Sequence, residues 1–455
     1  MSPAASLTDM AKDIWQAGVD AVSSERLVGE SVSRSGDRLA ICGCDFDVAQ
    51  LGRLVVVGAG KAGAGMSAAV EASIGADLLA RTTGFVNVPE DCVRPLQKIT
   101  LHGARPASVN EPTQAGVNGA AKILELVSGL EDNDLCLALI SGGGSALLPA
   151  PIDGISLVDK QTITRLLMHC GATINELNCV RKQLSKIKGG GLARAAKRGR
   201  VITLIISDVA GDPLDVIASG PTVEDPSTAA EAISILGRLV SGRSSVPEAV
   251  WTALQNKQAD TETTAPIDAE RIQNVILGNN QTAVDVAAAR ARELGFEVET
   301  ESEVGGVAAD FGRQLANRCL ASRETRSNSK LCLVSGGEPT VKLVETDHPR
   351  KGGRNQELVL AAIDQLRDDA TQGIVILSGG TDGEDGPTDA AGAWLDSNVL
   401  TGMRRQSLDP KPFLAMNNSY PFFEQAGGLL VTGPTHTNVM DLRVALIDSS
   451  SAGEV

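Results

Sequence analysis

The chain has 455 residues, too many for one ordinary hydrophobic core, so we expect two domains. Its formal charge of −15 argues against a nucleic acid or an anionic membrane as partner, and an anionic substrate would need a local positive pocket. Aromatic residues make up only 2% of the chain, which favours a core of Ala, Val, Leu and Ile in strands covered by helices.

The first 27 residues have neither the charged start nor the long apolar core of a secretory signal. They contain Asp9, Asp13 and Asp20, which argue against a mitochondrial transit peptide. No apolar run is long enough to span a membrane. Eight scattered cysteines fit reduced thiols. We therefore expect a cytoplasmic protein and leave open a mitochondrial form with a longer chain.

Short apolar runs alternate with amphipathic segments along most of the chain. The predicted strands are Leu54–Val57, Thr83–Val88, Leu135–Ile140, Val201–Ile206, Asn274–Leu277, Leu331–Val334, Ile374–Leu377, Leu429–Thr432 and Leu442–Ile447. The predicted helices are Ala62–Ile74, Gln114–Ser128, Leu157–Cys170, Gly190–Lys197, Ser227–Leu236, Gln281–Leu294, Val307–Ser322 and Asn355–Leu366. This alternation predicts an α/β fold built from βαβ units with largely parallel sheets.

The first predicted strand leads directly into a glycine-rich turn and then into a helical pattern. Gly58, Gly60 and Gly63 match G-x-G-x-x-G, a spacing that places backbone N–H groups and a helix N-terminus against an anion. Taken alone, the spacing is a dinucleotide-binding fingerprint. Lys61 lies inside the turn, however, and its ammonium suits a phosphate that is moved better than one that is only held.

A second glycine-rich loop follows the third predicted strand. Its residues are Ser141, Gly142, Gly143, Gly144 and Ser145. Such a loop lets the backbone approach a ligand closely at the carboxyl end of a strand, where open α/β sheets bind ligands. We prefer this interpretation to a flexible loop without a ligand, because no turn needs so many glycines.

Four cations lie between residues 181 and 188, just before another glycine-rich helix start. In a chain this acidic, a cluster that includes Arg181, Lys182 and Lys188 indicates electrostatic attraction of phosphates and a carboxylate. For any single one of these lysines, a solvated helix face is the alternative.

A carboxylate follows the strand predicted at Val201–Ile206. Asp208 lies just beyond the strand end, where it could act as a base or hold Mg²⁺; the alternative is an Asp-rich turn. Farther along, Ser219 and Gly220 belong to a segment with a hydroxyl and a glycine that we expect to contact the nucleotide.

Two further candidates lie in the last third of the chain. Arg354 stands between two glycines and a helix start, a position suited to bidentate binding of an oxyanion, although a surface arginine near a turn is the alternative. The acidic loop that follows the strand Ile374–Leu377 contains Asp382 and Asp389, which could hold a hard cation.

Motifs that do not occur narrow the choice of reaction. The chain has no G-x-x-x-x-G-K-[ST] phosphate loop and no protein-kinase signature. A dinucleotide-dependent reductase should carry an acid at the end of its second strand, but Asn87 takes that place. Phosphoryl transfer needs cations, a carboxylate-held Mg²⁺ and an oriented hydroxyl, and Lys61, Arg354 and the Asp-rich loops supply those residue types.

In their order and number, these motifs resemble the type II glycerate kinases, and several pieces resemble the animal branch of that family. The resemblance runs from about Val55 to Ile447. The motifs that carry it are Gly-Ala-Gly-Lys61-Ala, Ser-Gly-Gly-Gly-Ser145-Ala-Leu-Leu-Pro, Ile-Lys188-Gly-Gly-Gly, Ser-Asp208-Val, Ala-Ser219-Gly-Pro, Gly-Gly-Arg354-Asn-Gln-Glu and Thr-Asp382-Gly-Glu-Asp-Gly-Pro-Thr-Asp389.

The resemblance implies in-line, ATP-dependent phosphorylation of D-glycerate and favours the 2-hydroxyl, giving 2-phosphoglycerate. It also implies a Rossmann-like domain over residues 1–265 and a smaller α/β MOFRL domain over 266–455, with the active site in the cleft between them. A nicotinamide-dependent reductase of a small hydroxy acid and a kinase for another small hydroxy acid are the alternatives. Whether the protein is a monomer or a homodimer is left open.

The family's proposed catalytic pair corresponds here to Lys61 and Arg354, and Lys61 would neutralise charge on the transferred phosphoryl group. Asp208 is our candidate general base. Mg²⁺–ATP would lie along the glycine loops, and Mg²⁺ would be held by Asp382, Asp389 or Asp208. The residues expected to bind this cofactor are Gly58, Gly60, Gly63, Ser141, Gly142, Gly143, Gly144, Ser145, Lys188, Ser219 and Gly220.

The sequence leaves two points open. The glycerate carboxylate would lie either near Arg354 or in the cation cluster of residues 181–188. Near His102 the chain departs from the pattern of the bacterial family members, and Arg105 or Asn110 is expected to take over any role of that segment.

Overall fold

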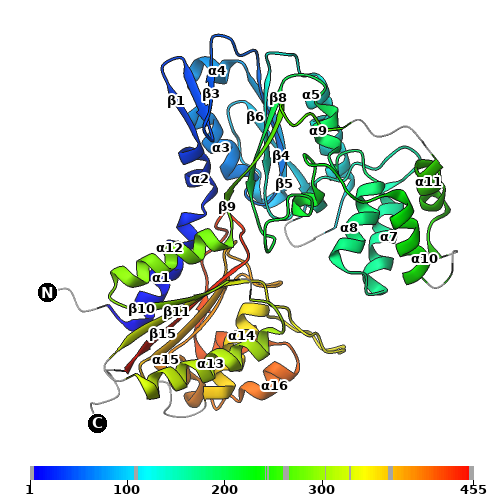
Figure 1. Cartoon of the computed structure of the whole chain (residues 1–455). Coiled ribbons are helices and arrows are strands. Elements are labelled where there is room, and N and C mark those ends of the chain that lie inside the picture. The colour runs from blue at the N-terminus through cyan, green and yellow to red at the C-terminus, as the bar shows by residue number, and fades with distance from the viewer. Residues whose placement is uncertain are drawn as a thin grey trace. The chain divides into compact units, whose positions relative to one another are not determined.

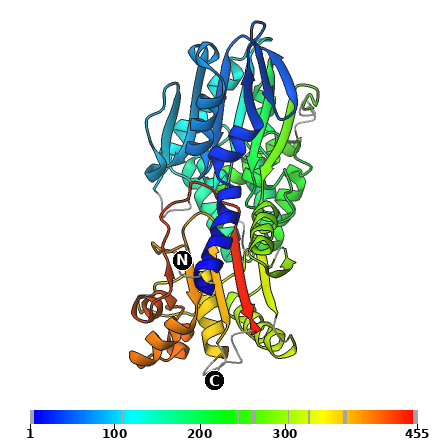
Figure 2. The same cartoon turned by 90° about the vertical axis from the view of Figure 1, so that its left-hand side faces the viewer.

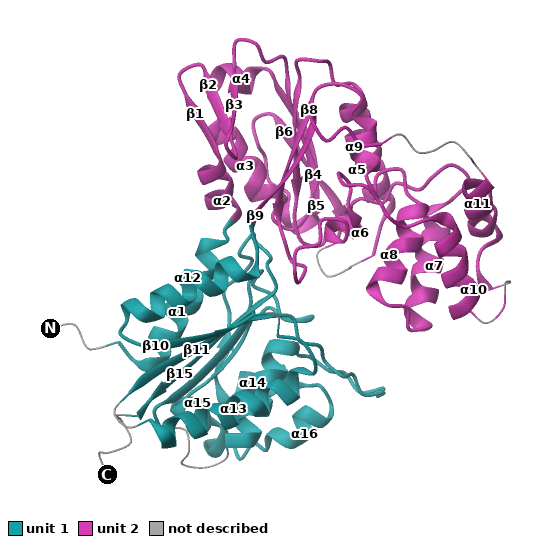
Figure 3. Ribbon diagram, in the orientation of Figure 1, with its two compact units in different colours: residues 1–23, 278–455 teal, residues 24–277 magenta. Residues whose placement is uncertain are grey.

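The computed structural model describes residues 5–106, 111–240, 242, 245–259, 266–302, 304–326, 329–366 and 372–449. The chain forms two compact units (Figure 3): residues 24–277 make one, which we call unit 2, and residues 1–23 with 278–455 make the other, unit 1. The predicted domains, 1–265 and 266–455, differ from this division in two places: residues 1–23 belong to unit 1, and residues 266–277 belong to unit 2. The reason is that strand β9 (Ile272–Gly278) joins the sheet of unit 2, whereas helix α1 (Leu7–Ala21) packs in the core of unit 1.

Unit 2 is built on a six-stranded sheet with the strand order β6-β5-β4-β7-β8-β9. Its elements up to β6 are α2 (Ser24–Ser31), β1 (Val32–Ser35), β2 (Arg38–Ile41), β3 (Cys44–Asp47), β4 (Leu54–Ala59), α3 (Gly63–Ser73), α4 (Ala76–Ala80), β5 (Thr82–Pro89), η1 (Glu90–Cys92) and β6 (Ile99–Arg105). The remainder are α5 (Gln114–Ser128), β7 (Leu135–Ile140), α6 (Gly144–Leu147), α7 (Leu157–His169), α8 (Ile174–Gln183), α9 (Gly191–Ala195), β8 (Arg200–Ile206), η2 (Ile217–Ser219), α10 (Ala229–Leu239) and α11 (Glu248–Ala259). The pairs β5–β6, β4–β5, β4–β7 and β7–β8 are parallel, as the sequence predicts.

Helices cover both faces of this sheet (Figure 1), and the central strands β4 and β7 are accordingly buried along their whole length. Successive residues of β5 show the two faces: a Cβ on Gly63 of α3 would touch Val86, whereas Asn87 points at Gly119 of α5. Helices α7, α8, α10 and α11 pack on a separate apolar core of their own. The small antiparallel sheet β1–β3 (Figure 2, blue) was not predicted from the sequence.

Unit 1 contains a second six-stranded sheet, with the order β10-β11-β15-β12-β13-β14. Besides α1, its elements are α12 (Asn280–Glu293), β10 (Glu297–Glu301), α13 (Ala308–Thr325), β11 (Lys330–Gly337), α14 (Arg354–Leu366), β12 (Ile374–Gly380), β13 (Gly392–Leu395), α15 (Ser397–Arg405), α16 (Pro410–Ala415), α17 (Ser419–Ala426), β14 (Leu429–Leu430) and β15 (Asp441–Asp448). Helices α1 and α12 pack on one face of this sheet and α13 and α14 on the other.

This second sheet is mixed rather than largely parallel, in contrast to the prediction. Only β10 and β11 pair in parallel, and β15 lies antiparallel between β11 and β12. A parallel neighbour requires a crossover connection, usually a helix, but residues 431–440, which lead into β15, contain no helix. In the described part of the chain, no helix is both long and apolar enough to cross a membrane.

The neighbouring strands β4 and β7 approach each other where a side chain would not fit. A Cβ on Gly58 would lie 2.1 Å from the carbonyl oxygen of Leu139. Because that oxygen belongs to the backbone of β7, it cannot move aside without disturbing the sheet. The glycine at position 58 is therefore required by the packing of two strands, whatever it contributes to a ligand.

We predict that Gly58→Ala lowers the free energy of unfolding of unit 2 by about 3 kcal/mol, the upper end of the usual cost of overpacking, since the added methyl overlaps backbone. The matched control is Gly237→Ala, on the exposed face of α10, where an added Cβ meets no atom within 4 Å. That change should stabilise the helix by about 0.5–1 kcal/mol. Urea unfolding followed by circular dichroism measures both, and equal effects at the two positions would contradict the packing argument.

Candidate active site

Three predicted site segments of unit 2 lie at one edge of its sheet. Ala59 pairs with Ile140, and Ile140 pairs with Ile205, so the loops that follow β4, β7 and β8 emerge side by side. Lys61 and Asp208 lie in the first and third of these loops. Ligands of parallel α/β sheets bind at such carboxyl ends.

The first two loops are joined through their backbones. The backbone N–H of Lys61 donates to the carbonyl of Gly142 (2.9 Å), and the N–H of Ala62 donates to the hydroxyl of Ser141 (3.0 Å). Gly60 is needed for this contact, because it has φ +149° and a Cβ there would lie 2.0 Å from the Ser141 hydroxyl oxygen. Lys61 is thus anchored at its backbone against the glycine loop.

Arg105, which ends β6, lies beside the same loop. A Cβ on Gly143 would lie 3.4 Å from Nη2 of Arg105 and 3.8 Å from Cγ of Lys61, so the two cationic side chains flank this glycine. The Arg105 side chain is buried, and its Nη1 donates to the carbonyl of Pro106 (3.2 Å). Of the two residues expected to take over the role of the segment near His102, Arg105 therefore lies beside the glycine loop; Asn110, the other candidate, lies outside the described residues.

A network of side chains continues from the end of the glycine loop. The hydroxyl of Ser145 accepts hydrogen bonds from Lys188 Nζ (2.7 Å) and Arg181 Nη2 (2.9 Å) and lies 2.9 Å from the hydroxyl of Ser219. Gly220, with φ +61°, closes the turn after Ser219, and a Cβ there would lie 2.9 Å from Cα of Asp215. Sequence positions 145, 181, 188 and 219 are therefore brought together by the fold.

A third cation of this group, Lys160 on α7, was missed from the sequence. It is buried, and its ammonium donates to the carbonyl of Leu184 (3.0 Å). Burial, together with the charge of Arg181, lowers the pKa of Lys160 to about 7. Burial, then Arg181 and Lys160, lower the pKa of Lys188 well below its ordinary value. The only signal in the sequence was a lysine among the buried positions of an amphipathic helix.

The other two lysines of the predicted cluster point elsewhere. Lys182 is buried but pairs with Asp215 (3.2 Å) and Asp225 (3.5 Å). Lys186 is exposed and pairs with Asp153 (2.6 Å). The predicted cluster of four thus separates into two cations at the site and two that are balanced by acids.

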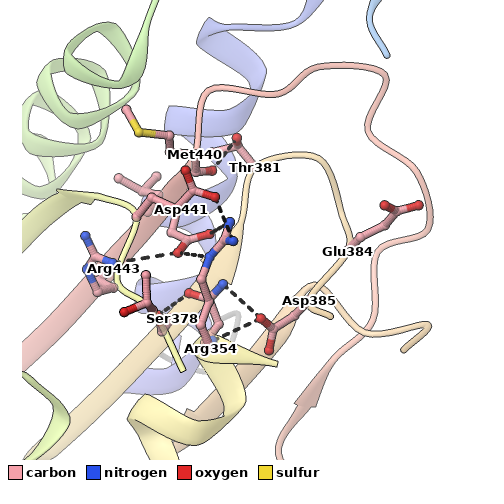
Figure 4. Close-up of polar contacts among 12 residues, drawn as sticks. Arg354, Ser378, Thr381, Glu384, Asp385, Met440, Asp441 and Arg443 are labelled. Atoms are coloured by element: carbon pink, nitrogen blue, oxygen red, sulfur yellow. Dashed lines mark hydrogen bonds and ion pairs between the residues drawn. The ribbon is translucent and has the colours of Figure 1, made fainter. Parts of the chain in front are cut away.

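Unit 1 contains the second group of site residues, around Arg354 (Figure 4). Arg354 is the first residue of α14, and its guanidinium makes a bidentate contact with Asp441, through Nε (2.7 Å) and Nη2 (2.9 Å). Its Nη1 lies 2.8 Å from a carboxylate oxygen of Glu338. Burial opposes the charge of Arg354, but the two acids outweigh burial and raise its pKa. Neither acid was predicted, because both reach Arg354 only through the fold.

Asp385 holds the start of α14 in place (Figure 4). Its carboxylate accepts hydrogen bonds from the backbone N–H groups of Asn355 (3.0 Å) and Gln356 (2.8 Å), so it caps the helix from a distant loop. A Cβ on Gly353 would lie 2.3 Å from the Asp385 carboxyl carbon. The glycines before Arg354 therefore make room for this cap. Burial raises the pKa of Asp385 to about 7.

The predicted metal ligands have different surroundings. Asp382 accepts a hydrogen bond from the backbone N–H of Glu384 (3.0 Å). Burial raises the pKa of the nearby Glu338, and the charges of Asp441 and then Asp382 add to the rise. Asp389 is exposed and lies 3.7 Å from Lys351 Nζ, an ion pair that a metal would have to displace. Within the described ranges, no three His, Cys, Asp or Glu side chains are grouped to hold a metal ion. These residues fit Mg²⁺ only as an ion shared with ligand phosphates.

The raised pKa of Asp385 gives a prediction about stability. A carboxyl whose pKa is raised on folding contributes most at low pH, and the contribution is lost as the pH rises through about 7. The free energy of unfolding of the wild type minus that of Asp385→Asn should therefore fall between pH 5 and 8. Fluorescence in a Trp251→Phe background would report unit 1 through Trp15 and Trp394, and a difference that is flat or rises would refute the shift.

Comparison with known proteins supports the two-part organisation. A family model described as a domain of unknown function, DUF4147, matches residues 10–255, and the MOFRL family model matches residues 331–441. Human glycerate kinase is 36% identical over 97% of this chain and 93% of the human one. Glycerate 2-kinase of Pyrococcus horikoshii is 36% identical over 95% of both chains.

A solved structure and one further relative complete the comparison. The crystal structure of glycerate kinase (EC 2.7.1.31) from Thermotoga maritima superposes with a TM-score of 0.81 at 34% identity and covers 97% of this chain and 99% of that one. An Agrobacterium vitis protein that is 40% identical over 87% of each chain is provisionally named a hydroxypyruvate reductase. With matches of this length and identity to glycerate kinases of animals and of thermophilic microbes, this chain belongs to the glycerate kinase family.

Proposed function

We propose that this protein transfers the γ-phosphoryl group of ATP to D-glycerate and forms 2-phosphoglycerate. Membership of the glycerate kinase family supports the reaction, and the name of the Pyrococcus relative supports the 2-hydroxyl as acceptor. The observation that carries the proposal is the position of Lys61, whose backbone is bonded to Gly142 and whose side chain lies beside Gly143 and Arg105.

In this proposal the hydroxyl oxygen of glycerate bonds to the γ-phosphorus while the bond from that phosphorus to the β–γ bridging oxygen breaks. ADP leaves with the bridging oxygen, and the hydroxyl proton passes to Asp208. Lys61 stabilises the negative charge on the transferring group, because such transition states depend mainly on positioning and charge. Arg354 adds its charge once Glu338 moves away from its Nη1. The glycine loops after β4 and β7 hold the nucleotide phosphates with their backbone N–H groups.

Mg²⁺ would be held by Asp382 together with the nucleotide and would neutralise phosphate charge. Asp389 remains the second candidate from the sequence, and its ion pair with Lys351 makes it the weaker of the two. The roles given above to Lys61, Arg354 and Asp208 are the same whichever of these acids holds the ion.

A nicotinamide-dependent reductase is the second candidate, favoured by the name of the Agrobacterium relative. The surroundings of Asn87 argue against it. A reductase of this type would need a side chain at the end of β5 to bind the ribose hydroxyls. Asn87 is buried, and its amide donates to the carbonyl of Leu147 (2.7 Å) and so joins β5 to α6.

We predict that Lys61→Ala lowers kcat for D-glycerate by about 100-fold or more while the protein stays folded, because one cation that stabilises the transferring phosphoryl is lost. The control is Lys122→Ala, which removes an exposed lysine paired with Glu125 and should leave kcat unchanged. An ATP-coupled assay measures kcat, and phosphorus NMR of the product identifies the hydroxyl. Near-normal turnover by a folded Lys61→Ala protein would contradict the role.

The same preparation tests the reductase alternative. Oxidation of NADH or NADPH with hydroxypyruvate, in the absence of ATP, should be undetectable. Reduction without ATP-dependent phosphorylation of glycerate would overturn the proposed function.

The role of Asp208 is tested separately by Asp208→Asn. If its carboxylate accepts the hydroxyl proton, the variant should lose most of kcat and also the fall in rate that the wild type shows when a carboxylate base becomes protonated at low pH. A pH–rate profile with the same shape as that of the wild type would remove Asp208 from the mechanism.

A further inference from the structure

We propose that Arg181 and Lys188, with the hydroxyls of Ser145 and Ser219, form the site that binds the carboxylate of the acid substrate, and that the buried charge of Lys160 adds to the attraction. This inference rests on the proposed function and decides between the two positions that the sequence leaves open. It also assigns Ser145, Lys188 and Ser219 to the substrate rather than to the nucleotide.

The first argument is an imbalance of charge. In the part of the chain that the structure describes, Lys160, Arg181 and Lys188 form no ion pair with a carboxylate; their hydrogen bonds go to neutral oxygens. Burial without acids disfavours the charged forms of these groups, and so does the mutual repulsion that helps to lower the pKa values of Lys160 and Lys188. A bound anion removes both penalties. The neighbouring Lys182, equally buried, pairs with Asp215 and Asp225 and has no such need.

The second argument is the convergence of donors. Lys188 Nζ and Arg181 Nη2 both donate to the hydroxyl oxygen of Ser145, so the two charged groups lie around one atom. That hydroxyl lies 2.9 Å from the hydroxyl of Ser219. Ser145 is partly exposed, whereas Lys188 and Ser219 are buried, so a small ligand meets the group at Ser145.

The alternative position, at Arg354, has the opposite balance. All three guanidinium nitrogens of Arg354 already face acids, two on Asp441 and one on Glu338. One cation facing two carboxylates is net negative and would repel another carboxylate unless Glu338 moved away. Charge therefore favours the Arg181–Lys188 position for the substrate acid.

Size and distance favour a carboxylate over a nucleotide phosphate. The planar fork of an arginine matches two oxygens of a carboxylate or of a phosphate, so the position of the group decides between them. Ser145 is two residues from Gly143, beside which Lys61 lies, and consecutive Cα atoms are about 3.8 Å apart. A three-carbon hydroxy acid held at Ser145 can thus present its hydroxyl toward Lys61. The nucleotide phosphates are left to the backbone N–H groups of the glycine loops.

The test is a kinetic comparison of Arg181→Ala, Arg181→Lys and Lys188→Met with the wild type. Each should raise KM for D-glycerate at least about tenfold, because a buried charge-assisted hydrogen bond is lost, and leave KM for ATP within about twofold. Arg181→Lys keeps the charge and loses the fork, so it separates shape from charge. The matched control is Lys186→Ala, on the same segment, which should change neither constant. A rise in KM for ATP instead would assign the site to the nucleotide and overturn the proposal.

A second measurement does not depend on turnover. A bound carboxylate should raise the pKa of Lys160 from about 7 and also the lowered pKa of Lys188, so binding of D-glycerate without nucleotide should take up protons between pH 7 and 8. Calorimetry in buffers of different ionisation enthalpy measures this uptake, which Lys160→Met should reduce. Binding without proton uptake in the wild type would contradict the role of Lys160.

The two measurements also separate failure of the site from failure of the proposed function. If the wild type phosphorylates D-glycerate but folded Arg181→Ala and Lys188→Met proteins keep its KM, the site is wrong and the function stands. If the wild type binds D-glycerate with proton uptake, loses that binding in Arg181→Ala and yet transfers no phosphate, the site stands and the function is wrong.

Discussion

The close approach of the backbones of β4 and β7 is the constraint on which the site of unit 2 depends. At Gly58 and Gly60 a side chain would overlap the backbone of β7 or the Ser141 hydroxyl. Because these positions carry no side chain, the backbone of Lys61 can form its hydrogen bond with Gly142, and the loop that begins at Ser141 is held in one position. The same loop ends at Ser145, so one backbone contact fixes both Lys61 and the point where Arg181 and Lys188 meet.

The two units differ in how the charges of their site residues are balanced. The whole chain is acidic, with a formal charge of −15, yet the cations around Ser145 lack acid partners within the described residues, whereas Arg354 faces two acids. A buried, unbalanced cation group lowers the stability of the unliganded protein and returns that free energy when an anion binds. A balanced arginine instead gains a fixed orientation. The first arrangement suits capture of a small acid, and the second suits a charge kept in place for one step of the reaction.

Much of this was visible in the sequence, and the missing parts have a common cause. The apolar runs predicted the parallel sheet because strands buried on both faces lack alternation, and the spacing of Gly58, Gly60 and Lys61 predicted the turn. Lys160, Glu338 and Asp441 were not predicted, because nothing local distinguishes them from other charged residues. Each acquires its role from a contact with a residue far away in the chain, and a single sequence does not record such contacts.

The surroundings of Arg354 likewise depend on contacts between residues that are far apart in the chain. Helix α14 begins at Arg354 directly after two glycines, which have no side chain to cap it, and Asp385 supplies the cap from the loop after β12. Asp441, which orients the guanidinium, is the first residue of the last strand, and that strand is antiparallel to both of its neighbours. The mixed sheet, which the sequence did not predict, is therefore what carries Asp441 to Arg354. Because β15 runs antiparallel to both neighbours, its first residue and not its last lies at Arg354, so the direction of this one strand determines which acid orients the guanidinium.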